Sequence, residues 1–374
     1  MTKLIDITGK ALSGEWGSDD ETGDGIPVLR TTNFTNEGVV NYNDVVTRII
    51  TKKNIDNKFL RKGDIIIEKS GGSDKFPVGR VIYFNGDENT YLFNNFTGLL
   101  RVKNQEQWFP KYVFYSLFAN YKRGGTRIYE NKTTGLHNLK TDDYVSRYEV
   151  VDMNKKQQVL ICEKLDKLCE IIKLRKKELQ LLDDLIKARF VELFGDPVLN
   201  PHEWAKPELS DLADLKIGPF GSLLHKEDYI EGGHPLVNPS HIVDGRITID
   251  PKLTVSDEKY EELSAYQLKV GDVVMGRRGE MGRCAVVEEE GLLCGTGSLL
   301  IRPKGKVTAD YIQKIISYPT FKKTIEDMAV GQTMPNLNVP IVSGFRIISP
   351  PIEVQNSYYD FIAQVNKSKV VHYI

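Results

Sequence analysis

The longest regular pattern of apolar and polar positions runs from Lys155 to Phe194, a stretch without glycine or proline. Its seam positions recur at alternating steps of four and three, with Arg175 and Arg189 at two of them and apolar residues at the others, which predicts one helix with a single apolar seam. At 1.5 Å per residue, this helix is about 60 Å long. Gly195 and Pro197 follow it, as expected at a helix end. The predicted seam consists of Ile161, Leu165, Leu168, Ile172, Leu179, Leu182, Ile186 and Leu193.

A second, shorter helix with the same spacing is predicted after Pro350-Pro351, where Tyr358, Phe361 and Val365 form its seam. The two helices are expected to pack antiparallel through their apolar seams. Because the second helix is shorter, part of the first seam would lack this partner. That part would bind another protein, or pack on the rest of the chain or on a second copy, and periodicity leaves these alternatives open.

The chain repeats itself on the two sides of the long helix. Gly63-Asp64-Ile65-Ile66 returns as Gly271-Asp272-Val273-Val274, an offset of 271 − 63 = 208. Tyr148-Glu149-Val150-Val151 returns as Phe345-Arg346-Ile347-Ile348, an offset of 345 − 148 = 197. Matches between these points keep their order while the offset falls, as expected if one copy has shorter loops. The chain is therefore predicted to contain one module twice.

Each module combines short apolar runs with one longer stretch of helical periodicity. The predicted strands are GDIIIEK, GRVIYF and GLLRV in the first copy, and GDVVMG, RCAVVEE and SLLIRP in the second. The helical stretches are YVFYSLFANYK and ADYIQKIISYPTFKKTIEDM. The sequence thus predicts an α+β fold of two tandem, strand-rich modules, related by a pseudo-symmetric repeat and separated by long helices that form an antiparallel coiled coil.

Composition narrows the class of protein. With 40% hydrophobic and 27% charged residues, the 374-residue chain is typical of globular domains. A net charge of −1 and a pI of about 6.6 do not indicate a surface that is basic throughout, so nucleic-acid binding would depend on local patches. The four cysteines lack metal-ligand spacing, and no apolar run approaches the ~20 residues of a membrane span. We expect a cytoplasmic protein with reduced thiols, no metal site and no membrane contact.

An enzyme that acts alone is the first alternative, because Glu68-Lys69 follows an apolar strand, as acidic residues and lysine do in nuclease sites. The second copy has Gly276-Arg277 at this place but keeps the Gly-Asp turn and the apolar run. A constant frame with a variable basic loop favours recognition over catalysis. Motifs of nucleotide-binding loops, hydrolase elbows and metalloproteases are absent. Asn238-Pro239-Ser240-His241 resembles part of an adenine methyltransferase motif but lacks its second proline and its aromatic residue.

Basic and polar residues gather on equivalent loops of the two modules. Arginine and lysine bind phosphates or guanine, whereas asparagine, glutamine and threonine read base edges. Each of these residues alone is more simply a solvated surface group, but the set favours nucleic acid. The candidate nucleic-acid contacts are Asn33, Lys69, Ser70, Arg80, Arg127, Lys132, Thr134 and His137 in the first module, and His241, Arg277, Arg278, Arg283, Gln332 and Thr333 in the second.

The order of these motifs resembles a known family over essentially the whole chain. IPVLRTTNFTNEG, GDIIIEKSG and TGLHNLK precede a heptad helix that ends in Phe194-Gly195-Asp196-Pro197, and GHPLVNPSHIVDG, GDVVMGRRG and GQTMPNL follow it. This arrangement is similar to the specificity (S) subunit of type I restriction–modification systems. The resemblance implies target recognition domains at residues 1–152 and 196–351, a central conserved helix at 153–195 and a distal conserved helix at 352–374. This distal helix is shorter than is usual in the family.

The resemblance also implies a function. Each recognition domain would read one half of a bipartite double-stranded DNA target, while the helices set the spacing and dock methyltransferase (M) subunits, probably two. The M subunits would bind S-adenosylmethionine, and restriction (R) subunits would use ATP and magnesium. The chain itself would bind no cofactor and have no catalytic residue. A helical scaffold that binds proteins but ignores DNA is the second alternative.

Overall fold

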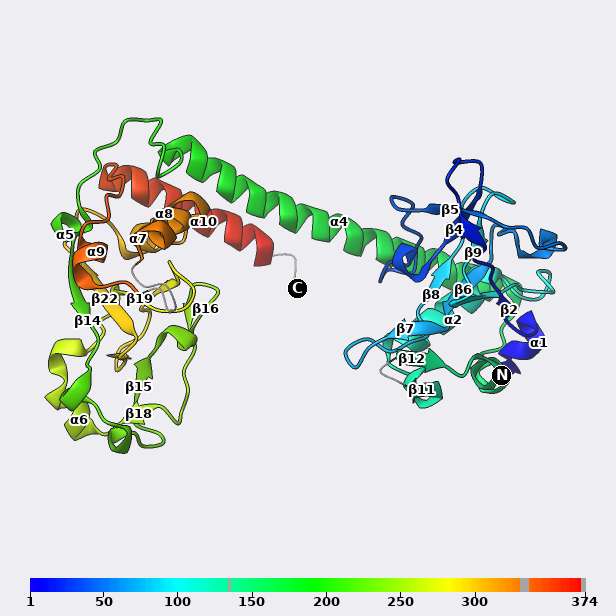
Figure 1. Ribbon diagram of the computed structural model, residues 1–374, viewed down its shortest axis with the longest axis horizontal. Helices are drawn as coiled ribbons and strands as arrows, with labels where there is room; N and C mark the ends of the chain where they lie inside the picture. The colour runs from blue at the N-terminus through cyan, green and yellow to red at the C-terminus, as the bar shows by residue number, and fades with distance from the viewer. Residues whose placement is uncertain (134–135, 330–335, 371–374) are drawn as a thin grey trace. The chain divides into compact units, whose positions relative to one another are not determined.

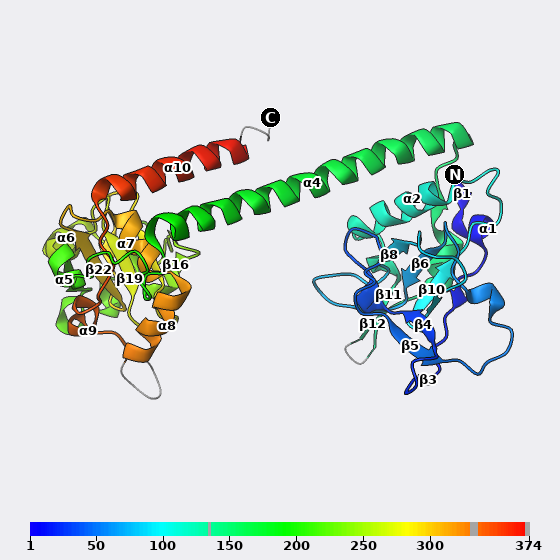
Figure 2. The same ribbon diagram turned by 90° about the horizontal axis from the view of Figure 1, so that it is seen from above.

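The computed structural model describes residues 1–133, 136–329 and 336–370. The chain divides into two compact units, Met1–Leu174 (unit 1) and Arg175–Ile374 (unit 2). The boundary falls inside the long helix α4 (Lys155–Phe194), which has the predicted bounds. Each unit is a strand-rich body with helices on its surface (Figures 1 and 2).

The described residues of unit 1 form three sheets and a two-stranded ladder. Its strands are β1 (Thr2–Lys3), β2 (Leu12–Ser13), β3 (Ser18–Asp19), β4 (Ile26–Leu29), β5 (Val46–Ile49), β6 (Ile65–Glu68), β7 (Ser70–Gly72), β8 (Val81–Tyr83), β9 (Leu92–Phe93), β10 (Thr97–Leu100), β11 (Glu130–Thr133), β12 (Leu136–Leu139) and β13 (Glu149–Val150). Its other helices are α1 (Leu4–Thr8), α2 (Pro110–Lys122) and α3 (Thr141–Arg147). The sheets have the orders β2-β10-β6-β8, β3-β5-β4-β9 and β11-β12-β7, and β1 pairs with β13.

Unit 2 repeats this plan. Its strands are β14 (Ala213–Ile217), β15 (His234–Val237), β16 (Ile242–Val243), β17 (Arg246–Ile247), β18 (Thr254–Val255), β19 (Val273–Gly276), β20 (Cys284–Val286), β21 (Leu293–Cys294) and β22 (Ser298–Pro303). Its helices are α5 (Leu209–Leu212), α6 (Asp257–Glu262), α7 (Ala309–Ile316), α8 (Pro319–Met328), α9 (Val339–Ser343) and α10 (Ile352–Val370). The order β14-β22-β19-β20 matches β2-β10-β6-β8, and the parallel pair β15–β21 matches β4–β9. The repeat in the sequence is therefore a repeat of the fold.

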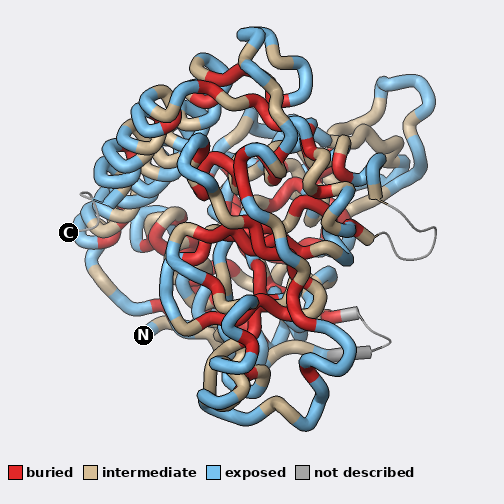
Figure 3. The backbone as a smooth tube through the Cα atoms, turned by 90° about the vertical axis from the view of Figure 1, so that its left-hand side faces the viewer, coloured by how far each residue is buried: buried red, intermediate tan, exposed pale blue. Residues whose placement is uncertain are grey.

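The strand after each Gly-Asp turn is buried on both faces. Ile65 and Ile67 belong to one hydrophobic core of unit 1, while Ile66 belongs to another. Val274 likewise faces a different core from its neighbours in β19. Two-sided burial explains why GDIIIEK and GDVVMG have continuous apolar runs instead of alternating patterns. In Figure 3, the buried stretches of the chain lie in the interior and the exposed stretches lie on the outside.

An ion pair between a buried aspartate and a partly exposed arginine lies at the start of this strand in each unit. Arg101 donates from Nε and Nη2 to the two carboxylate oxygens of Asp64, at 2.7 and 2.6 Å. Arg302 makes the same two bonds to Asp272, again at 2.7 and 2.6 Å. The aspartate side chains are only 2% and 3% exposed. Each also accepts a backbone amide hydrogen bond from three residues upstream, so the Gly-Asp turn is fixed from both sides.

A buried glutamine attaches the start of each long helix to its unit. In α4, Gln158 accepts the amide of Phe109 and donates to the carbonyls of Gln107 and Met153. In α10, Gln355 accepts the amide of Thr308 and donates to the carbonyls of Lys306 and Pro350. Both glutamines are fully buried. Their separation, 355 − 158 = 197, is the offset of the late repeat matches, so the sequence contained a signal for this pair.

Within unit 2, α4 and α10 pack antiparallel (Figure 1). Arg175 donates to the carbonyl of Lys369 at 2.9 Å, whereas the Tyr358 hydroxyl donates to the carbonyl of Ile186 at 3.5 Å. The Tyr358 ring also contacts the rings of Phe190 and Phe194.

Burial along the predicted seam follows this pairing. Ile186 and Leu193 pack on the core that contains Tyr358, and Val365 is buried. The seam positions Leu168 and Ile172 are 53% and 55% exposed. Ile161, Leu165, Leu179, Leu182 and Phe361 are half-buried.

One predicted helical stretch differs from the structure, whereas the predicted strands are present. The helical stretch after β22 is two helices, because Pro319 cannot continue α7 and instead begins α8. The six predicted strands are all present, as β6, β8, β10, β19, β20 and β22. Among the described residues, no helix is long and apolar enough to cross a membrane.

We predict that Arg101→Ala lowers the free energy of unfolding of unit 1 by about 3–5 kcal/mol, because it leaves the Asp64 carboxylate buried without its cation. Arg302→Ala should do the same in unit 2. Denaturant unfolding, followed separately for the two units, measures both effects.

The control is Arg346→Ala, which removes an exposed ion pair with Glu208 that spans 3.7 Å and should cost about 1 kcal/mol or less. Equal losses for Arg302→Ala and Arg346→Ala would contradict the role given to the buried pair.

Candidate nucleic-acid interface

In unit 1, the small sheet β11-β12-β7 brings several predicted DNA contacts together. The Leu139 amide donates to the Lys69 carbonyl at 2.8 Å, and Ser70 pairs with Asn138. Lys69 and Ser70 therefore lie beside the strand that carries His137. Lys132 lies in β11, but its side chain is outside the described residues, as is the whole of Thr134.

Unit 2 builds the same juxtaposition with different side chains. The Leu337 amide donates to the Arg277 carbonyl at 2.9 Å, and Arg278 forms a β-bridge with Asn336. These bonds match those of Lys69 and Ser70 position by position. Gln332 and Thr333 precede Asn336 but lie outside the described residues. In both units, the segment after the central strand (β6 or β19) thus pairs with a segment that follows the helices. This second segment is β12 in unit 1 and contains Asn336 and Leu337 in unit 2.

Arg277 and Arg278 are adjacent cations without a carboxylate partner among the described residues. The Nε atom of Arg277 is buried and has no hydrogen-bond partner there. Partial burial, with repulsion from Arg278, lowers the pKa of Arg277. An anion beside this pair would accept a hydrogen bond from the unpaired Nε atom. It would also offset the repulsion between the two positive charges.

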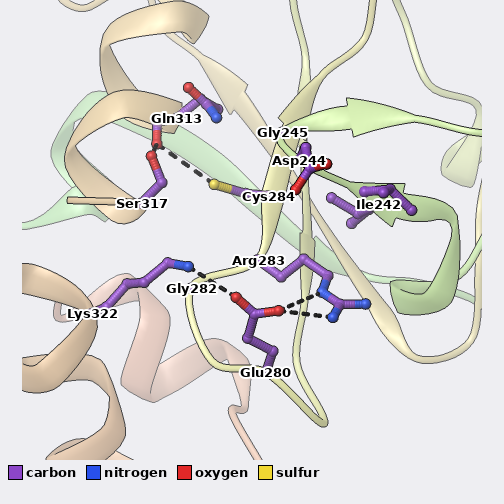
Figure 4. Close-up of a pocket in the computed structure, with 11 residues that line it drawn as sticks. Ile242, Asp244, Gly245, Glu280, Gly282, Arg283, Cys284, Gln313, Ser317 and Lys322 are labelled. Carbon is purple, nitrogen blue, oxygen red and sulfur yellow. Dashed lines mark hydrogen bonds and ion pairs between the residues drawn. The ribbon is translucent and has the colours of Figure 1, made fainter. Parts of the chain in front are cut away.

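Arg283, in contrast, is already bound within unit 2. Its Nη2 donates to the Glu280 carboxylate at 2.8 Å, and its Nη1 donates to the Pro239 carbonyl at 3.1 Å. Lys322 donates to the other oxygen of Glu280 at 3.0 Å. Figure 4 shows these three side chains meeting at the edge of a cavity of about 360 Å³. Because Glu280 serves both cations, they present less free positive charge than Arg277 and Arg278.

Arg80, the counterpart of Arg283, is also engaged inside its unit. It donates to the carbonyls of Phe34 and Thr31 at 2.9 Å and to the Glu68 carboxylate at 3.3 Å. Glu68 is 4% exposed. Burial raises the pKa of Glu68, against the opposing effect of Arg80. Glu68 was the acidic residue that a nuclease site would have used. In the structure it is the buried partner of Arg80, which binds backbone carbonyls of unit 1.

Asn33 and His241 occupy equivalent positions and have the same local role. Asn33 accepts the Arg30 amide and donates to the carbonyls of Asn41 and Asp44. His241 Nδ1 lies 2.8 Å from the Leu236 carbonyl. Their exposures of 1% and 7% leave no surface for a ligand. In this structure both residues stabilise the short turn after β4 or β15, and Arg80 and Arg283 likewise bind groups of their own units.

His137 and Arg127 hold the turn between β7 and β8. His137 Nδ1 lies 3.2 Å from Glu130 Oε2, while Glu130 Oε1 accepts the Val78 amide at 2.9 Å. Arg127 Nη2 donates to the carbonyls of Asp74 and Lys75. His137 is only 6% exposed, whereas Arg127 is exposed.

Lys69 is half-buried beside this sheet. Its Nζ donates to the Ser13 hydroxyl at 2.9 Å. Burial lowers its pKa, and the nearby positive charge of Lys58 acts in the same direction. Among the described residues, no group of three or more His, Cys, Asp or Glu side chains could hold a metal ion.

Known proteins share this architecture. The S subunit of a type I restriction–modification system from M. genitalium is 15% identical, with a TM-score of 0.55 over 98% of this chain and 89% of that one. A chain in a structure of type I restriction–modification complex assembly is also 15% identical, with a TM-score of 0.61 over 99% and 90%. The HsdS subunit of Thermoanaerobacter tengcongensis is 14% identical, with a TM-score of 0.50 over 99% and 89%. At these identities the likeness shows a shared fold.

Sequence comparisons are more specific. The MjaX type I restriction enzyme specificity subunit of Methanocaldococcus jannaschii is 27% identical over 183 residues, which are 45% of this chain and 42% of that protein. The alignment thus covers less than half the length of this relative. The profile of the type I restriction modification DNA specificity domain matches residues 3–183 and again residues 201–370. Since the two matches take up nearly the whole sequence, the chain belongs to the family of type I restriction–modification DNA specificity subunits.

Proposed function

We propose that each unit reads one half of a bipartite double-stranded DNA target. The observation that carries the proposal is the Arg277–Arg278 pair, two cations without an anionic partner among the described residues. They lie on the loop that is equivalent to Lys69-Ser70 of unit 1. Paired arginines at the end of a strand are suited to phosphate oxygens and to the O6 and N7 atoms of guanine.

In unit 1, the proposed contacts are Lys69, Ser70 and Arg127. Lys132 and Thr134 stay in the set as predictions from sequence, as do Gln332 and Thr333 in unit 2. His137 is a positioning residue, since it contacts the carboxylate that anchors the turn after β7.

The helices are proposed to dock the methyltransferase subunits. Several apolar side chains of α4 are between 48% and 60% exposed: Leu160, Leu168, Ile171, Ile172, Leu174, Leu181 and Leu185. So many exposed apolar groups on one helix are typical of a protein-binding surface. Two M subunits would supply S-adenosylmethionine, and R subunits would supply ATP and magnesium chemistry. The chain itself would act in the cytoplasm as a non-catalytic subunit.

Methylome sequencing of the host, with and without this gene, tests the function. One bipartite adenine-methylation motif should disappear with the gene and return with the complemented strain. Unchanged methylation would contradict the proposal. Methylation or cleavage by the purified chain alone, given DNA, magnesium and S-adenosylmethionine, would favour the enzyme alternative. Binding of M subunits without binding of DNA would favour the scaffold.

For unit 2, we predict that Arg277→Ala with Arg278→Ala weakens target binding by the complex with M subunits by about thirty-fold or more. Each well-formed arginine–guanine contact is worth about 1–3 kcal/mol. DNA binding and methylation assays measure the loss, and the Arg346→Ala variant serves as the control. Wild-type affinity in the double variant would remove these residues from the interface.

Exchange of residues 1–152 for those of another specificity subunit should change one half-site and leave the other half-site unchanged. The reason is that each unit has its own hydrophobic cores and its own recognition loop. Methylome sequencing shows which half of the motif changes. A change in both halves would contradict independent reading by the two units.

A further inference from the structure

Three large apolar side chains are exposed around the recognition surface of unit 1, which is formed by the proposed contacts Lys69, Ser70 and Arg127. Phe76 is 53% exposed, Phe96 is 54% exposed and Ile128 is 80% exposed. The Phe96 carbonyl accepts the amide of Lys69, and Ile128 directly follows Arg127. Single exposed apolar residues are ordinary, but a group set among the proposed cationic contacts indicates a binding role.

Phe76 stands on a turn that is held in one conformation. The Ser73 amide donates to the Phe76 carbonyl at 2.7 Å, and the Phe76 amide donates to the Ser73 hydroxyl at 3.1 Å. Arg127 binds the two carbonyls between them, at 3.1 and 3.4 Å. These bonds fix the backbone before any ligand arrives, so an aromatic contact from this turn would cost little conformational entropy.

Two cations flank Phe76, while the Asp74 carboxylate of the same turn lies 3.7 Å from His137 Nε2. Lys75 Nζ lies 5.5 Å from the centre of the Phe76 ring, and Arg127 spans the same turn. Cations around an apolar tip match the major groove of DNA, where phosphates flank the base edges. The thymine C5-methyl group is the apolar feature of those edges, and phenylalanine is one of the side chains that contact it.

The equivalent loop of unit 2 has a different character. Met281 is the one large apolar residue between Arg277 and Arg283, and it is only 4% exposed. This loop presents Arg277 and Arg278 instead. The two loops therefore share a backbone frame but offer different chemistry, an apolar tip in unit 1 and guanidinium groups in unit 2.

We propose that Phe76 contacts the C5-methyl group of a thymine in the half-site read by unit 1. The inference rests on the proposed function, since it takes duplex DNA as the ligand of this surface. It goes beyond that function by naming a base feature and the side chain that reads it. Phe76 would thus be a specificity-determining residue.

The test replaces each thymine of that half-site in turn by deoxyuridine, which lacks only the methyl group. The complex with M subunits is titrated with these duplexes once the methylome has given the target. At one position, loss of the methyl group should weaken binding by the wild-type complex about four-fold, the effect of one buried methyl group. The Phe76→Ala complex should bind the thymine duplex more weakly than the wild-type complex does. Its affinities for the thymine duplex and the deoxyuridine duplex should be equal.

Two further variants define the outcome. Phe76→Leu keeps an apolar side chain and should retain part of the discrimination. Phe220→Ala, a change at a 59% exposed phenylalanine of unit 2, should keep all of it. Recognition of the other half-site by the Phe76 variants shows that the complex is folded.

The inference is overturned if the Phe76→Ala complex still prefers thymine to deoxyuridine as strongly as the wild-type complex does. It is also overturned if the wild-type complex shows this preference at no position of the half-site. In both cases the proposed function stands. A wild-type complex that does not prefer its target overturns both.

Discussion

The two-sided burial of one strand in each unit is the constraint on which the rest of the structure depends. β6 and β19 separate two hydrophobic cores, so a shift by one residue would exchange the residues that face each core. The ion pairs Asp64–Arg101 and Asp272–Arg302 fix where these strands begin. Once the start is fixed, the place where each strand leaves the core is fixed as well, and the recognition loop starts at that place.

The helices depend on the same frame through a different contact. Gln158 and Gln355 satisfy backbone groups of their own units, so each helix starts at a defined point of its unit. Within unit 2, Ile186 and Leu193 of α4 pack against the core that contains Tyr358 of α10, and this packing joins the two helices. The apolar positions of α4 outside these contacts stay exposed.

Sequence reasoning succeeded where the determinants are local or repeated. The bounds of α4 follow from its heptads and from Gly195, and the central strands follow from their apolar runs. Strand order did not follow, because pairs such as β4–β9 join segments far apart in the chain, which one sequence does not reveal.

For the site, the sequence identified the loops but not the direction of each side chain. Arg80 and Arg127 are both arginines in polar loops of the first module, and the sequence does not distinguish them. In the structure, Arg80 is half-buried and donates to the carbonyls of Phe34 and Thr31, while Arg127 is exposed. The repeat contained part of the missing information, since the arginine kept in both copies is the one bound inside. Lys75 and Phe76 have no counterpart in the second copy, and only the structure shows how firmly their turn is held.

Arg80 and Arg283 keep equivalent carbonyl ligands but take their carboxylate from different places, Glu68 at the end of the strand or Glu280 in the loop beyond it. Each unit thus places an acid near this arginine, and the position of that acid differs between the units. A loop of different length and composition would be compatible with the same strands if either the strand or the loop supplied that acid. This tolerance separates the inheritance of the fold from the inheritance of the target.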